Sequence, residues 1–152
     1  MRACHLLSAL LTWSTAGACA GSALCAPEER TLWECPASKK TYALCASADL
    51  SANSGYLQYR TGAADRVEFT IPVAKRHPKG RFLYTNYWRF VRLTFENGAY
   101  AYEVEEQLVG PTTVRVTRAG KLASEFQCSN ASRTLMSTDV MKLFDEAGVS
   151  AQ

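Results

Sequence analysis

The sequence predicts a mainly β protein, either an antiparallel β-sandwich or a partly open β-barrel of about eight strands, with one C-terminal α-helix. Three observations support this class. From residue 31 onward, short segments of alternating apolar and polar residues are separated by turn residues. Apolar residues at helical spacing follow Arg133. After the N-terminal leader described next, the 152-residue chain has room for one domain, because most domains hold about 100 to 150 residues.

Residues 1–20 have the composition of a cleavable signal peptide. A positively charged start precedes an apolar run over residues 6–13, and small residues follow up to Ala20. We expect cleavage after Ala20, within the small-residue stretch 20–22. An uncleaved anchor is disfavoured because a bilayer-spanning helix needs roughly 20 apolar residues. Acylation of Cys19, as in a lipoprotein, is a further alternative. The chain is therefore expected to be periplasmic or secreted, with no transmembrane helix after cleavage.

Removal of the signal leaves Cys25, Cys35, Cys45 and Cys128. An even number of cysteines in a small exported domain predicts two disulfides. Four cysteines allow three connectivities, and the sequence does not choose among them. A metal site is disfavoured because the cysteines contain no closely spaced Cys-x-x-Cys pair. We expect neither a metal nor another cofactor.

Residues 21–30 form an N-terminal segment, and a single β-rich domain is expected over residues 31–152. Segments 31–35 and 40–45 flank a polar turn and predict a hairpin. A second pair is predicted from segments 55–61 and 66–71. In segment 66–71 the apolar residues alternate with polar ones and are assigned to one inward face, which holds Val67, Phe69 and Ile71.

The clearest hairpin joins segment 87–95 to segment 99–105. Asn97-Gly98 lies between them, and this dipeptide favours the two positive φ angles of a type I′ turn. Segments 112–117 and 121–128 predict the last strand pair, across a turn that ends at a glycine.

The end of the domain predicts a helix over about residues 134–147. Ser137 or Thr138, with Asp139, suits the N-terminus of a helix, and Gly148 suits its end. The apolar residues at helical spacing are Met136, Val140, Leu143, Phe144 and Ala147. We expect this helix to pack on a sheet.

The residues that commonly perform catalysis are few. His77 is the only histidine after the signal, and its cationic neighbours and adjacent proline suit a solvated loop. Glu103 and Glu105 share a strand face and are expected to form a solvent-facing row, with Glu106 beside them. No nucleophile motif, phosphate-binding loop or metal signature is present. The sequence therefore predicts no catalytic residues and a non-enzymatic role.

The charge distribution is more informative than the formal net charge of +3. No acidic residue lies between Glu68 and Glu96, and aromatic residues are interleaved with the cations of this stretch. Strand parity directs two rings and one cation away from the core, so a ligand-binding platform is one interpretation. The alternative is that the C-terminal helix covers the rings. The expected ligand-binding residues are Lys75, Arg76, Lys79, Arg81, Trp88, Arg89, Phe90 and Arg92.

Three motifs carry a resemblance to other proteins. They are Leu44-Cys45-Ala46-Ser47, Ser54-Gly55-Tyr56-Leu57-Gln58-Tyr59-Arg60 and Phe95-Glu96-Asn97-Gly98-Ala99-Tyr100-Ala101-Tyr102. With them the chain resembles, over residues 35–105, a group of small exported bacterial proteins of uncharacterised function. The resemblance implies a bacterial, exported protein and transfers no activity. A looser similarity is to periplasmic lysozyme inhibitors, which are also small disulfide-bearing β proteins.

These observations predict an exported binding protein for an anionic envelope glycan, lipid or protein surface. Cations among aromatic rings also suit nucleic acid, but export disfavours that partner. The first alternative is an inhibitor of a cell-wall hydrolase such as lysozyme. The second is a small envelope hydrolase that acts through Glu103 or Glu105.

Overall fold

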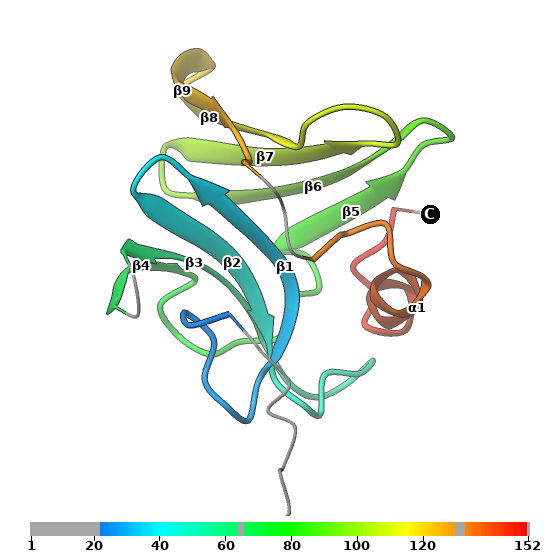
Figure 1. Ribbon diagram of the computed structural model, residues 1–152. Coiled ribbons are helices and arrows are strands. Elements are labelled where there is room, and N and C mark those ends of the chain that lie inside the picture. The colour runs from blue at the N-terminus through cyan, green and yellow to red at the C-terminus, as the bar shows by residue number, and fades with distance from the viewer. Residues whose placement is uncertain (1–21, 64–65, 130–132, 152) are drawn as a thin grey trace, which may run out of the picture.

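The computed structural model describes residues 22–63, 66–129 and 133–151. In these residues nine antiparallel strands form two sheets that pack face to face, with one short helix (Figure 1). This arrangement confirms the mainly β class and corresponds to the sandwich rather than to a closed barrel. The expected signal peptide, residues 1–20, lies outside the described residues.

The first sheet contains four strands in chain order, each paired with the next. They are β1 (Arg30–Ala37), β2 (Lys40–Ala46), β3 (Leu57–Ala63) and β4 (Arg66–Ile71). Both predicted hairpins of this region are confirmed. The inward assignment of segment 66–71 holds for Ile71, whereas Val67 and Phe69 are partly exposed. Ile71 pairs with Tyr59, which touches the opposite sheet, but Val67 pairs with Gly62, beyond a β-bulge.

The second sheet contains the remaining five strands, again in chain order. They are β5 (Phe82–Asn86), β6 (Phe90–Asn97), β7 (Tyr100–Gln107), β8 (Thr113–Arg118) and β9 (Lys121–Gln127). The sequence did not assign β5, which is short and follows a loop rich in cations. The predicted pairs β6–β7 and β8–β9 are confirmed.

The turn between β6 and β7 differs from the prediction by one residue. Asn97 pairs with Tyr100, so Gly98 and Ala99 are the two turn residues. Gly98 has a φ of 60°, and neither Asn97 nor Ala99 has a positive φ. A single positive φ at the first turn position is typical of a type II′ turn, which uses glycine there and leaves asparagine in the strand.

Aromatic rings fill the space between the two sheets. Tyr59 of β3 lies 5.0 Å from Phe95 of β6, and Tyr42 stacks on Phe126 at 4.4 Å between ring centroids. The disulfide between Cys35 and Cys128 joins the first sheet to the residue that follows β9. The second disulfide joins Cys25 to Cys45, so both predicted bridges form. Two disulfides in one small domain indicate an oxidising compartment.

The helix α1 (Thr138–Glu146) lies beside β1 and β5 (Figure 1). Its apolar side enters the core, and Phe144 lies 5.0 Å from the inward ring of Tyr84. Residues 149–151 then run along the outer edge of β5, where the amide of Tyr84 donates to the carbonyl of Val149. The predicted helix is confirmed over a shorter span than the expected 134–147, and it packs against the edge of the sandwich rather than over Trp88. None of the helices described is long and apolar enough to cross a membrane.

Candidate binding surface

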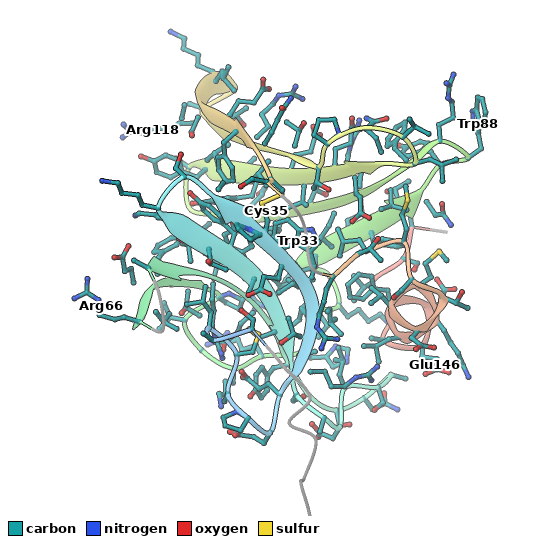
Figure 2. All side chains as sticks on the ribbon, viewed as in Figure 1. Trp33, Cys35, Arg66, Trp88, Arg118 and Glu146 are labelled. Carbon is teal, nitrogen blue, oxygen red and sulfur yellow. A yellow bond between two sulfur atoms is a disulfide. The ribbon has the colours of Figure 1, made fainter. Side chains whose placement is uncertain are left out.

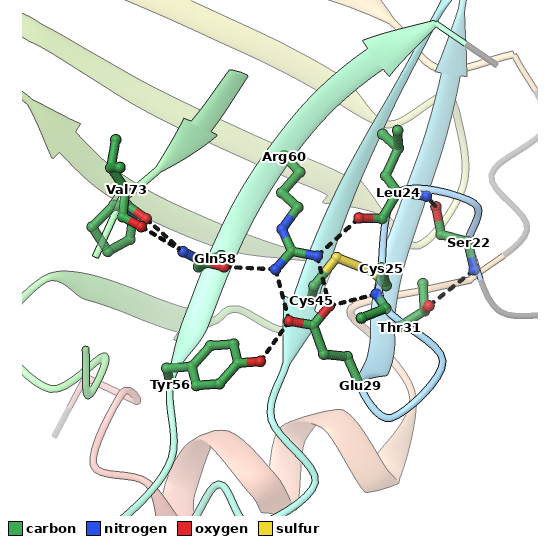
Figure 3. Close-up of polar contacts among 12 residues, drawn as sticks. Ser22, Leu24, Cys25, Glu29, Thr31, Cys45, Tyr56, Gln58, Arg60 and Val73 are labelled. Atoms are coloured by element: carbon green, nitrogen blue, oxygen red, sulfur yellow. Dashed lines mark hydrogen bonds and ion pairs between the residues drawn. A yellow bond between two sulfur atoms is a disulfide. The ribbon is translucent and has the colours of Figure 1, made fainter. Parts of the chain in front are cut away.

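The outer face of the first sheet is covered by the N-terminal segment. Leu24 and the Cys25–Cys45 disulfide pack with Ala43 in a small second core. Beside them, Arg60 of β3 forms a bidentate ion pair with Glu29 at 2.6 and 2.7 Å (Figure 3). Arg60 also donates to the carbonyl of Leu24. These contacts hold the segment on the sheet and leave little of this face open.

Glu29 is fully enclosed by its partners. Burial alone would raise the pKa of this carboxyl group, but hydrogen bonds from Arg60, the Tyr56 hydroxyl and the Ala26 amide outweigh burial and lower it. Glu29 also lies near the sulfur atoms of Cys25 and Cys45, a grouping typical of metal ligands. Because the two sulfurs are bonded to each other and Glu29 is bound to Arg60, this cluster has a structural role in the disulfide form.

The outer face of the second sheet carries a charge ladder, which consists of Arg92, Glu103, Glu105, Arg115 and Glu125. Arg92 lies 2.6 Å from Glu105 and 3.3 Å from Glu103. Arg115 bridges Glu103, at 3.0 Å, and Glu125, at 2.8 Å. The expected solvent-facing row of Glu103 and Glu105 is therefore present, but arginines occupy both carboxylates. Arg92 has two acidic neighbours and does not face the solvent as a free cation.

The side chain of Glu106 points to the opposite face of the sheet from the charge ladder. Its buried carboxylate accepts hydrogen bonds from the Thr134 hydroxyl and from the amide of Leu135, at 2.9 Å for the amide. The hydroxyl of Tyr84 donates to the carbonyl of Leu135. Burial, with a contribution from the Glu106 carboxylate, raises the pKa of Tyr84 to about 12. Glu106 thus fixes the chain that leads into the helix.

An exposed apolar cluster lies at one end of the second sheet. We call it the aromatic tip and define it as Tyr87, Trp88, Arg89, Phe90, Leu108 and Val109. The loop before β6, the first residue of β6 and the loop after β7 supply these residues, and the amide of Leu108 donates to the carbonyl of Arg89 at 2.8 Å. Figure 2 shows Trp88 at the periphery of the molecule, whereas Trp33 lies inside.

The aromatic tip is unusually open for its composition. The exposed fractions are 85% for Trp88, 91% for Val109 and 67% for Leu108. Between the two loops lies a notch of about 510 Å³, lined by tip residues and Gln107. Clustered exposed apolar side chains of this kind mark interaction surfaces more often than isolated ones do.

Arg92 supports the aromatic tip from below. Its guanidinium lies 5.1 Å from the ring of Phe90 and 5.7 Å from the ring of Tyr87. These two rings stack at 4.3 Å between centroids. Since Arg92 is held by Glu105, the ladder positions the base of the tip. Arg89 differs, because its guanidinium lies 4.8 Å over the exposed ring of Trp88.

The other predicted binding cations lie elsewhere. Lys75, Arg76, Lys79 and Arg81 belong to an exposed basic loop that precedes β5. This loop and the aromatic tip are at opposite ends of β5, roughly 20 Å apart at about 3.3 Å per residue. His77 lies in the same loop, and its Nε2 donates to the carbonyl of Ser51 at 2.8 Å. The structure therefore divides the predicted set of cations and rings into two separate surfaces.

Sequence reasoning missed Leu108 and Val109. Their signal is present in the chain, since two aliphatic residues directly precede the turn residues Gly110 and Pro111. Apolar residues between a strand and a turn do not face the core as strand residues do. The sequence did not show, however, that this loop lies beside Trp88.

Compared with protein-family models, with curated proteins and with solved structures, the chain matches none of them. The similarity to small exported bacterial proteins and to lysozyme inhibitors therefore stays a prediction.

Proposed function

We propose that the protein is an exported, non-enzymatic binding protein that recognises a component of the bacterial cell envelope through the aromatic tip. The observation that carries this proposal is the exposure of Trp88 beside Leu108 and Val109. A large ring is normally buried in a domain of this size, and here the sandwich has a filled core without it.

The rigidity of the aromatic tip supports recognition rather than chance exposure. The base of the tip is held by the stacking of Phe90 on Tyr87 and by the contacts of Arg92. A backbone hydrogen bond from the amide of Leu108 to the carbonyl of Arg89 joins its two loops. A surface held in place before binding loses less conformational entropy when the partner binds. The carboxylates named for the hydrolase alternative, Glu103 and Glu105, have arginine partners.

A binding assay with fractionated bacterial envelopes tests the proposal. We expect the exported protein to sediment with an envelope fraction and the Trp88→Ala variant to lose most of this binding. Leu122→Ala is the matched control, because Leu122 is also an exposed large apolar residue but lies on β9. Equal sedimentation of the wild type and Trp88→Ala, or equal loss in both variants, would contradict the role of the tip.

A further inference from the structure

The aromatic tip is small and projects from the end of the sandwich. Its most exposed apolar residues are Trp88, Leu108 and Val109, with Tyr87 partly exposed beside them. Together these side chains expose less than the roughly 800 Å² that each partner buries in a standard protein interface. Trp88 points away from the body of the molecule (Figure 2). The size and position of the tip therefore suit shallow insertion into a surface better than a broad protein contact.

The charge of the aromatic tip suits a negatively charged surface. The two loops, residues 86–90 and 107–112, contain one cation, Arg89, and no acidic residue. Within the described ranges no carboxylate forms an ion pair with Arg89. Its guanidinium lies over Trp88, and Arg89 is one of the residues that line the notch, so the cation and the apolar side chains meet the same partner.

We infer that the aromatic tip binds the surface of an anionic lipid bilayer, an inference that rests on the proposed function and names its partner. Trp88, Leu108 and Val109 enter the boundary between headgroups and acyl chains, where tryptophan is favoured. Arg89 pairs with lipid phosphate at the same depth, since guanidinium is a good bidentate partner for phosphate. The charge ladder behind the tip remains outside the bilayer and keeps the rings of Tyr87 and Phe90 in position.

Vesicle binding tests this inference with the exported protein. We expect co-sedimentation with phosphatidylcholine vesicles that contain phosphatidylglycerol, weaker binding without the anionic lipid, and weaker binding at high salt. Trp33 is buried, so a blue shift of tryptophan fluorescence that disappears in Trp88→Phe reports insertion of Trp88. Trp88→Ala should weaken binding about tenfold or more, because a large apolar side chain no longer leaves water.

A matched pair of charge reversals distinguishes a local contact between the tip and lipid from a general effect of the protein's overall charge on vesicle binding. Arg118, like Arg89, lies over an exposed ring, that of Tyr100, but belongs to the far end of β8. We expect Arg89→Glu to weaken vesicle binding about tenfold and Arg118→Glu to leave it nearly unchanged. Equal effects of the two reversals would overturn the inference.

Binding to envelope fractions through Trp88 without binding to pure lipid vesicles would also overturn it, in favour of a protein or glycan partner, while the proposed function would stand. Absence of both kinds of binding would remove both.

Discussion

The two sheets carry arginine–carboxylate contacts on their outer faces, but the two settings differ. On the first sheet, the side chains of Arg60 and Glu29 are 11% and 0% exposed beneath the N-terminal segment. On the second sheet, the side chains of Arg92 and Arg115 are 32% and 47% exposed in the charge ladder. The same residue types therefore stabilise the domain in one place and organise an open surface in the other.

Burial decides what each cluster contributes. When one partner of a buried ion pair is removed, the other charge remains in a poorly solvated site without compensation. Water and salt screen an exposed pair, so its loss has little effect on folding. The covered face thus depends on a complete set of partners, whereas the open face tolerates substitution and is free to take part in binding.

Arg60→Ala should produce the largest effect. It leaves the Glu29 carboxylate buried without its bidentate partner, and we expect the free energy of unfolding to fall by about 3 to 5 kcal/mol. Chemical denaturation measures this change. Arg66→Ala is the control, because the ion pair that Arg66 forms with Glu68 is exposed and its loss should change stability little. A similar small change in Arg60→Ala would show that Glu29 is not enclosed as described.

Low pH should weaken the buried Arg60–Glu29 pair, with a smaller effect on stability than Arg60→Ala has. The pKa of Glu29 is lowered in the folded state, so its stabilising contribution is complete above the unfolded value, near 4.5, and is lost as the pH falls through the folded value. Glu29→Gln lacks this titration. We expect the difference in unfolding free energy between the wild type and Glu29→Gln to be largest at neutral pH and to shrink below pH 4.5. Parallel stability curves for the two proteins would contradict the prediction.

The strands were predictable where a local signal determines them. Alternation of apolar residues located β6 and β7, and turn residues located their connection to within one position. β5 lacked such a signal, because its burial depends on Phe144 of the helix and on the chain end along its edge. The inward face of β4 was overestimated for a different reason, since a bulge at Glu68 of β4 shifts its register against Gly62.

The candidate site was predictable only in part. Strand parity placed Phe90 and Arg92 on the outer face, and the structure agrees. The acidic partners of Arg92 come from the neighbouring strand, and pairing across strands sets which residues face each other. Composition alone therefore could not show that Arg92 is neutralised, nor that β5 separates the basic loop from Trp88.

Arg92→Ala should have the smallest effect on stability and a clear effect on binding. Its ion pairs are partly exposed, so we expect a loss of about 1 kcal/mol or less in unfolding free energy. Binding to envelope fractions should nevertheless weaken, because the rings of Phe90 and Tyr87 lose the guanidinium against which they are held. Fluorescence anisotropy of Trp88 should fall as the tip becomes more mobile.

Arg115→Ala is the control that isolates this positioning role. Arg115 shares the Glu103 partner with Arg92 but belongs to the other end of the ladder, and among the described residues it makes no ring contact of the kind that Arg92 makes. If the ladder acted only through charge, the two substitutions would weaken binding equally. Because support of the rings requires contact with them, we expect Arg115→Ala to bind as the wild type does and only Arg92→Ala to lose affinity.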